Sequence, residues 1–261
     1  MNAEKHVTVL EDEDIAVLTL NRPPANALNI EALTELDSAI QKLNGNDAVR
    51  AVVLASGSEK FFCAGVDIKE LSTIQSEKDG VKYAELGQSV LGKINSATKP
   101  YIAAVEGVCV GGGCELALAC HLRIAGTAAK FALPEINLGV MPGFGGTYQL
   151  PECIGTPRAL EMMLTGKEVS AEEAQSMGLI NQAVNSGAAL ETALQLGKQI
   201  VGKGGRAIAA ILSVVNDPDC VSIEKKLKKE ANAFGKLFTT HDAREGFLAF
   251  LEKRLPDFKN K

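Results

Sequence analysis

The chain has 261 residues, of which 46% are hydrophobic and 23% are charged, and its formal net charge is -5 at pH 7. The length accommodates one large domain with a sizeable core, and the composition excludes an intrinsically disordered chain. The acidic charge gives no positive field that would attract phosphate backbones, so we expect no nucleic-acid partner.

The N-terminal part predicts a β-hairpin followed by an amphipathic helix. Residues 7–10 and 15–20 are rich in strand-forming side chains and flank an acidic tetrad, residues 11–14, which we interpret as a solvated turn. After the breaker Asn-Arg-Pro-Pro at 21–24, five apolar residues recur at helical spacing over residues 30–43 and predict the helix.

Short apolar runs alternate with helical segments through the middle of the chain, a pattern typical of an α/β fold. The runs are bounded by Gly, Ser or Pro, so we expect buried strands. In order, we predict a strand at 50–55, a glycine-containing loop at 61–67, a helix at 81–94, a strand at 101–105, a glycine-rich turn, a helix at 115–120, and strands at 122–125 and 130–133.

Strand-like patterns disappear from about Glu191 onward. Helical periodicity at 194–200, 224–234 and 242–252 predicts a helical C-terminal region. We therefore divide the chain into a core at 1–190, which carries the active site, and a C-terminal helical subdomain at 191–261.

The cysteines occur in largely apolar surroundings, without the Cys-x-x-Cys spacing of a zinc site or redox pair. They are Cys63, Cys109, Cys114, Cys120, Cys153 and Cys220. We interpret them as buried free thiols in a reducing, cytoplasmic setting, and we expect no bound metal. The first 14 residues contain no basic segment followed by an apolar one, so we expect no secretory signal.

The longest apolar stretch, residues 101–120, approaches the length of a membrane span but contains Glu106, Glu115 and three consecutive glycines. A carboxylate at the centre of a bilayer costs about 2.5 to 3.5 kcal/mol. We therefore expect a buried core segment and no membrane partner.

Residues 107–118, GVCVGGGCELAL, place three glycines directly before a run of helix formers. Backbone N–H groups at a helix N-terminus lack intrahelical partners and carry partial positive charge, so they can receive an anion or a developing oxyanion. A glycine turn that only permits close packing is the alternative. The segment lacks the Gly-Lys-Ser/Thr of a nucleotide P-loop and the Gly-x-Gly-x-x-Gly spacing of a dinucleotide site.

Two glutamates in apolar segments are candidates for acid–base chemistry. Glu115 falls in the first turn of the predicted helix, where the helix dipole favours its ionised form, and Glu135 follows a proline. A dipole-complementing glutamate and an exposed loop glutamate are the respective alternatives. The chain has only His6, His121 and His241 and no Gly-x-Ser-x-Gly elbow, so we expect no serine or cysteine triad. For His121 we expect a structural hydrogen-bonding role.

Five short motifs occur in a characteristic order along the chain. They are Asn21-Arg22-Pro23 with Asn26-Ala27-Leu28, FCAGVDIK at 62–69, GGGCEL at 111–116, Pro134-Glu135, and PGFGGT at 142–147. Together they resemble the enoyl-CoA hydratase/isomerase (crotonase) family, and the resemblance runs from Leu18 to nearly the end of the chain.

The resemblance implies a crotonase-like spiral of repeated β-β-α units. It also implies C-terminal helices that cover the pocket and associate subunits into a homotrimer or, as a dimer of trimers, a homohexamer. The backbone N–H groups of Val66 and Gly112 would bind the thioester oxygen of an acyl-CoA substrate. Most relatives have alanine where Val66 stands. Because the backbone supplies the donor, this change should narrow the pocket more than it weakens the oxyanion hole.

In the family, the equivalents of Glu115 and Glu135 share a water molecule: the first assists its attack on C3 and the second exchanges the proton at C2. Coenzyme A is then part of the substrate, and no separate cofactor is implied. The substrate-binding residues carried over by the resemblance are Ala64, Val66, Asp67, Ile68, Lys69, Gly112 and Lys253. The two lysines among them could equally be exposed, solubilising side chains.

The chain departs from many relatives at two places. His121 stands where aspartate is frequent, and Tyr148-Gln149 stands where Gln-Arg is frequent. Neither change involves the two glutamates. At both positions the packing and the salt bridges can differ from those of the relatives.

The presence of both glutamates favours reversible hydration of a trans-2-enoyl-CoA to a 3-hydroxyacyl-CoA in fatty-acid β-oxidation, because family isomerases generally keep only one of them. A Δ3,Δ2-enoyl-CoA isomerase or a methylglutaconyl-CoA-type hydratase would use the same oxyanion hole. A non-catalytic acyl-CoA- or RNA-binding protein is the alternative from another class. The acidic net charge argues against its RNA version.

Overall fold

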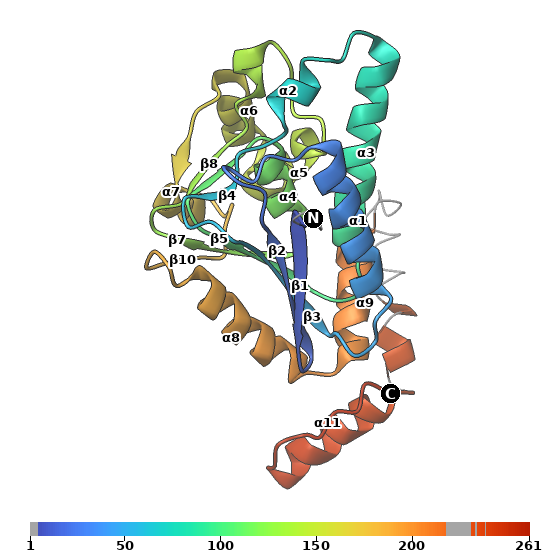
Figure 1. The fold of residues 1–261 in the computed structure, drawn as a ribbon. Helices are drawn as coiled ribbons and strands as arrows, with labels where there is room; N and C mark the ends of the chain where they lie inside the picture. Colours follow the sequence, from blue (N-terminus) through green and yellow to red (C-terminus); the bar gives the residue numbers. More distant parts are fainter. Residues whose placement is uncertain (1–4, 218–230, 233, 238) are drawn as a thin grey trace.

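The computed structural model describes residues 5–217, 231–232, 234–237 and 239–261. Within them the framework is a six-stranded sheet beside a four-stranded one (Figure 1). In spatial order the larger sheet contains β1 (Val7–Asp12), β2 (Ile15–Leu20), β3 (Ala51–Ser56), β5 (Tyr101–Val105), β7 (Leu122–Gly126) and β10 (Gln182–Val184). Only the β1–β2 pair is antiparallel in this sheet, so the predicted hairpin is confirmed and the rest of the sheet is parallel.

The smaller sheet contains short strands, the first three of which each follow a strand of the larger sheet along the chain. In spatial order they are β4 (Phe61–Cys63), β6 (Val108–Val110), β8 (Lys130–Ala132) and β9 (Val169–Ser170). The helices are α1 (Ile30–Asn44), α2 (Ile68–Leu71), α3 (Glu77–Asn95), α4 (Gly112–Ala119), the 3-10 turn η1 (Glu135–Leu138), α5 (Gly146–Ile154), α6 (Thr156–Thr165), α7 (Ala171–Ser176), α8 (Ala189–Val201), α9 (Gly205–Val215) and α11 (His241–Glu252).

Each turn of the chain passes through a strand of the larger sheet, a strand of the smaller sheet and then a helix. Thus β3 and β4 lead to α2 and α3, β5 and β6 lead to α4, and β7 and β8 lead to η1 and α5. The predicted α/β spiral of β-β-α units is therefore confirmed.

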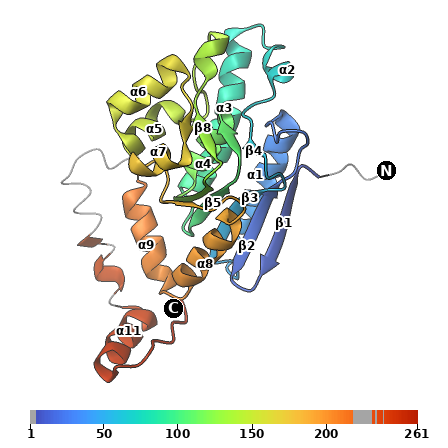
Figure 2. The ribbon, with the colours of Figure 1, turned by 90° about the vertical axis from the view of Figure 1, so that its left-hand side faces the viewer.

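The central strands are covered on both faces, which explains why they are continuously apolar. Successive side chains of β3 point to opposite faces of the sheet. Val52 and Leu54 enter the main core, whereas Val53 packs in a second cluster with Ala189 and Ala193 of α8. Figure 2 shows α8 lying across this sheet.

Two segments differ from the prediction. Residues 61–63 and 108–110 were predicted as part of a loop and a glycine-rich turn, but they are strands β4 and β6, which pair with each other in parallel. Three residues are too few to show the alternation that identifies a strand. In the hairpin, β1 extends to Asp12, so only Glu13 and Asp14 remain for the turn.

Among the C-terminal helices, α8 packs on the larger sheet, whereas α11 lies at one end of the molecule and stands apart from both sheets in two views (Figures 1 and 2). Most of the predicted helix at 224–234 lies outside the described residues. Helix α8 spans the boundary that we placed at residue 190, and that boundary stays a prediction. In the described part of the chain, no helix is both long and apolar enough to cross a membrane.

Candidate active site

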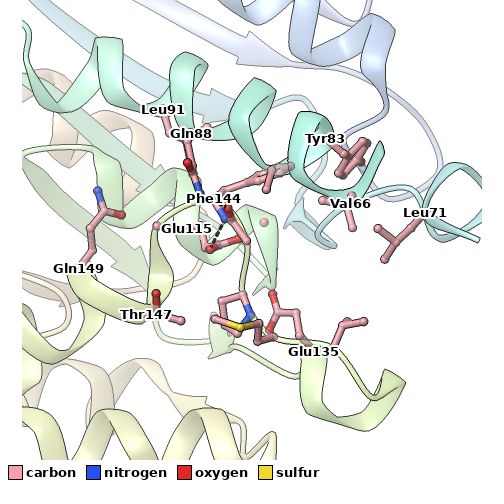
Figure 3. Close-up of a pocket in the computed structure, with 18 of the residues that line it drawn as sticks. Val66, Leu71, Tyr83, Gln88, Leu91, Glu115, Glu135, Phe144, Thr147 and Gln149 are labelled. Carbon is pink, nitrogen blue, oxygen red and sulfur yellow. Dashed lines mark hydrogen bonds between the residues drawn. The ribbon is translucent and has the colours of Figure 1, made fainter. Parts of the chain in front are cut away.

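A cavity of about 830 Å³ lies between α3, the start of α4, η1 and the loop before α5 (Figure 3). Four residues singled out in the sequence line it together, although they come from separate segments of the chain. They are Val66, Gly112, Glu115 and Glu135. The structure therefore assembles the two proposed donors and the two proposed carboxyl groups around one space.

The N–H of Gly112 is available because α4 begins at this residue. The preceding residue, Gly111, has a φ of +54°, a left-handed conformation that glycine adopts without strain. Among the described residues, no acceptor contacts the Gly112 N–H, as expected for the first turn of a helix. Because Gly112 lines the cavity, this helix N-terminus offers a polarised donor at the cavity wall.

The N–H of Val66 is available for a different reason. Leu28 and Val66 form an isolated parallel bridge, in which the Leu28 N–H donates to the Gly65 carbonyl at 2.7 Å and the Asp67 N–H donates to the Leu28 carbonyl at 2.8 Å. The bridge uses the Gly65 carbonyl and the Asp67 N–H, which lie on either side of Val66. Its own N–H has no acceptor within the part of the chain that the structure describes.

Glycines allow the two donor segments to approach closely. A Cβ atom on Gly65 would lie 3.1 Å from the Val110 carbonyl oxygen and 3.6 Å from the Gly112 nitrogen. The Val66 side chain lies beside the second donor, with its Cγ1 3.1 Å from the position of a Cβ on Gly112. The geometry suits an oxyanion hole built from two backbone N–H groups.

Glu115 is buried, with only 2% of its surface exposed. Its Oε1 accepts hydrogen bonds from the backbone N–H groups of Phe144 and Gly146, each at 2.8 Å. Burial raises its pKa to about 7, the nearby Glu135 adds to the rise, and the backbone N–H groups oppose it. The start of α4 was expected to favour the ionised form, but burial outweighs that effect.

Glu135 is the first residue of η1, and its side chain is half-buried. Its Oε1 lies 3.1 Å from the position that a Cβ on Gly111 would occupy. Its Oε2 is buried without a hydrogen-bond partner among the described residues, and burial raises the pKa of the carboxyl group. Figure 3 shows Glu115 and Glu135 facing the same part of the cavity. Two such carboxyl groups can pass protons to and from a ligand placed between them.

The loop before α5 contributes a function that sequence reasoning missed. Its backbone holds Glu115, and the Phe144 ring packs so tightly on α3 that a Cβ on Gly87 would lie 2.1 Å from it. The motif at 142–147 indicated that this loop belongs to the site. The pairing with Glu115 was not visible, because it joins residues about 30 positions apart.

The predicted CoA-binding residues fall into two groups. Ala64, Asp67, Ile68 and Lys69 are neighbours of Val66 in the sequence but are not among the residues that line the cavity. Asp67 caps α2 by accepting the Lys69 N–H at 3.0 Å, and the Lys69 side chain is exposed. Lys253 follows α11 at the opposite end of the molecule from α2, so the isolated chain does not bring it to the cavity (Figure 1). These assignments stay predictions.

Of the positions that depart from the family pattern, Gln149 is buried, His121 is half-buried and Tyr148 is exposed. His121 Nδ1 accepts the Tyr101 N–H at 3.0 Å, which confirms the expected structural role, and burial lowers the pKa of the imidazole to about 4. Gln149 lines the cavity from α5, and its Oε1 has no partner among the described residues.

The cysteine prediction is confirmed for most of the thiols. Cys63, Cys109, Cys114 and Cys120 are free and buried, whereas Cys153 is free and partly exposed. Cys220 lies outside the described residues.

Comparisons along the whole chain agree with the geometry of the site. A family model for enoyl-CoA hydratase/isomerase matches residues 11–261. A probable enoyl-CoA hydratase of Bacillus subtilis is 42% identical over 100% of both chains, and a crotonyl-CoA hydratase of Syntrophomonas wolfei is 38% identical over 99% of this chain and 100% of its own. The crystal structure of an enoyl-CoA hydratase from Bacillus anthracis has a TM-score of 0.93 at 33% identity, and covers 98% of this chain and 100% of that one. The chain belongs to the enoyl-CoA hydratase/isomerase family.

Proposed function

We propose that this protein is an enoyl-CoA hydratase, a hydro-lyase that adds water reversibly to a trans-2-enoyl-CoA and gives a 3-hydroxyacyl-CoA. The observation that carries the proposal is the buried Glu115 and the half-buried Glu135 in one cavity with the backbone N–H groups of Val66 and Gly112, which have no acceptor among the described residues. The relatives described above bear hydratase names, which supports the same activity.

In the proposed mechanism, the N–H groups of Val66 and Gly112 bind the thioester oxygen and stabilise the enolate that forms there. Glu115 accepts a proton from water as the water oxygen bonds to C3. Glu135 donates a proton to C2, so that one water molecule is added in total. This step leaves Glu115 protonated and Glu135 ionised, so a proton passes from Glu115 to Glu135 before the next cycle, and the two carboxyl groups act as one coupled acid and base.

The surroundings of the pair fit this chemistry. A hydration cycle starts with one carboxyl group ionised and the other protonated. Burial raises the pKa of both groups, and the charge of Glu135 raises that of Glu115 further. The pair therefore favours retaining a proton near neutral pH, where general acid–base catalysis is most effective. The chemistry uses groups of this chain alone and requires no resident cofactor.

The test is to follow the absorbance of the conjugated enoyl thioester while the purified protein acts on crotonyl-CoA. We expect the absorbance to fall as 3-hydroxybutyryl-CoA forms. Glu115→Gln and Glu135→Gln should each lower kcat by about 10² to 10⁴-fold, the usual contribution of general acid–base catalysis, and leave acyl-CoA binding largely intact. No loss of absorbance at high enzyme concentration would refute hydration of a short enoyl chain.

We further infer that subunits associate through their C-terminal helices into a trimer or a dimer of trimers. In the isolated chain, large apolar side chains of α9 and α11 are exposed, with Ile211 at 61%, Val215 at 69% and Leu251 at 77%. Such an assembly could bring Lys253 of one copy toward the cavity of another. Light scattering should give three or six times the chain mass of 27.5 kDa, and a monomer would contradict the inference. We propose a cytoplasmic location, which cell fractionation would test.

A further inference from the structure

The Val66 donor lies in a segment that no long element supports. Residues 64–67 follow the three-residue strand β4 and precede the four-residue helix α2. The Gly112 donor, in contrast, begins an eight-residue helix whose residues are all buried. The direction of the Val66 N–H therefore depends on contacts with another part of the chain.

A segment that we call the strap, residues 22–28, supplies these contacts. The Ala64 N–H donates to the Ala25 carbonyl at 3.0 Å. Leu28 bonds to both neighbours of Val66: its N–H donates to the Gly65 carbonyl, and its own carbonyl accepts the Asp67 N–H. The strap thus fixes the backbone before and after the donor.

The strap is itself anchored through Asn26, which is 4% exposed. The Asn26 Nδ2 donates to the carbonyl oxygens of Phe61 and Phe62, each at 3.2 Å, and its Oδ1 accepts the Arg22 N–H at 2.7 Å. The two bonds to Phe61 and Phe62 connect the strap to β4, and the bond to Arg22 lies within the strap. They do not reach the far side of the donor, toward α2, where the Leu28 carbonyl is joined by a second group of the strap.

Arg22 is that group. Its Nη1 donates to the Ala27 carbonyl at 3.0 Å, and its Nη2 donates to Asp67 Oδ2 at 2.8 Å. The second carboxylate oxygen, Asp67 Oδ1, accepts the N–H of Lys69 at the start of α2. The hydrogen bond from Arg22 holds the pKa of Asp67 below its ordinary value, so the carboxylate stays charged and the contact persists near neutral pH.

We propose that Arg22 is a positioning residue for the oxyanion hole: through Asp67 and the Ala27 carbonyl it sets the direction of the Val66 N–H. Arg22 does not touch the reacting atoms in this proposal, which rests on the proposed hydratase function. Removal of a complete oxyanion donor costs about 10² to 10³-fold in kcat. Loss of positioning should cost less, about tenfold to 100-fold, because the Val66 N–H remains but turns away.

Two variants of Arg22 and two readouts test the proposal. Arg22→Met removes both bonds, whereas Arg22→Lys keeps the charge next to Asp67 but lacks the planar fork that reaches two acceptors. The first readout is kcat for crotonyl-CoA. The second is the red shift in absorbance of bound hexadienoyl-CoA, which reports polarisation of the thioester carbonyl. It is recorded in the Glu115→Gln background, where hydration does not consume the probe.

Arg50→Met is the matched control. Arg50 Nη2 donates to the Lys203 carbonyl at 2.7 Å, its Nη1 lies 3.7 Å from Asp14 Oδ2, and its side chain is 17% exposed against 24% for Arg22. The Arg50→Met variant therefore loses contacts comparable to those lost in Arg22→Met, but away from the cavity. We expect a lower thermal midpoint with unchanged kcat and an unchanged red shift.

We expect Arg22→Met to lower kcat by about tenfold to 100-fold and to diminish the red shift, with KM nearly unchanged and partial recovery in Arg22→Lys. If the Arg22 variants keep the full kcat and the full red shift, the proposal is overturned, even if they unfold earlier. If Arg22→Met does not fold, Arg22→Lys decides by the same two readouts. If the wild type hydrates no enoyl-CoA, the hydratase proposal fails, and the red shift still tests the role of Arg22.

Discussion

Replacing Glu115 by glutamine should stabilise the folded protein at alkaline pH while it removes most of the activity. Glu115 Oε1 accepts two backbone N–H groups at 2.8 Å each. The carbonyl oxygen of a glutamine can accept the same two bonds. The substitution therefore removes the buried charge and keeps the contacts that hold the side chain.

The magnitude follows from the pKa of Glu115, which is about 7 in the folded protein against 4.5 for a solvated glutamate. A pKa difference of one corresponds to about 1.4 kcal/mol, so the ionised carboxylate costs the folded state about 3 kcal/mol. The raised pKa means that the folded state binds the proton more tightly. Below pH 4.5 both states are protonated and the cost is absent; it grows as the pH rises and is complete above about pH 7.

The assay is urea unfolding of the wild type and Glu115→Gln at pH 5 and pH 8, at one protein concentration. We expect the variant to unfold at a higher urea concentration at pH 8, and the two midpoints to converge toward pH 5. Glu106→Gln is the matched control, because Glu106 Oε1 also accepts two backbone N–H groups, from Gly187 and Ala189 at 3.0 Å, outside the cavity. A Glu115→Gln protein that is no more stable than the wild type at pH 8 would refute the reasoning.

Two further perturbations test the surroundings of Glu115. In Glu135→Gln the Glu115 carboxyl should titrate at lower pH in ¹³C NMR, because the charge of Glu135 raises its pKa; an unchanged titration would exclude that coupling. Gly87→Ala should lower kcat by up to about 10²-fold, because the new Cβ would lie 2.1 Å from the Phe144 ring, whose residue holds Glu115. Gly92→Ala on the same helix is the control, since its Cβ meets nothing within 4 Å, and equal kcat values for both variants would contradict the packing argument.

The parts of the fold that the sequence predicted are those in which local pattern and tertiary environment agree. Strands β3 and β5 are apolar at successive positions because both faces of the sheet are covered, and α1 shows a clear apolar stripe. Strands β4 and β6 were missed because each has three residues and pairs with distant segments: they pair with each other across more than 40 positions, and β6 also pairs with β8, 22 positions further on. Pairing at that distance leaves no local pattern.

The candidate site likewise combines features that have a local sequence pattern with features that depend on distant contacts. The apolar neighbours of Glu115 and the glycines before it are local features, and they indicated a buried carboxyl group at a helix N-terminus. The Val66 N–H, which has no acceptor among the described residues, is set by the bridge to Leu28, and the anchoring of Glu115 depends on the loop around Phe144. Those contacts exist only after the chain has folded. The family resemblance suggested Val66 as a donor, but neither the bridge to Leu28 nor the anchoring of Glu115 was predicted.

The pKa of Glu115 shows why residue type and position within a helix were insufficient. A helix N-terminus favours a carboxylate by about 0.3 to 1 kcal/mol at an exposed site and up to about 2 kcal/mol when partly buried. Transfer of an ionised group into a protein interior costs several kcal/mol. At 2% exposure the second effect dominates, and two backbone N–H groups recover only part of it. The same depth that makes Glu115 a stability cost places its pKa near neutrality, where a group that must both accept and return a proton is most effective.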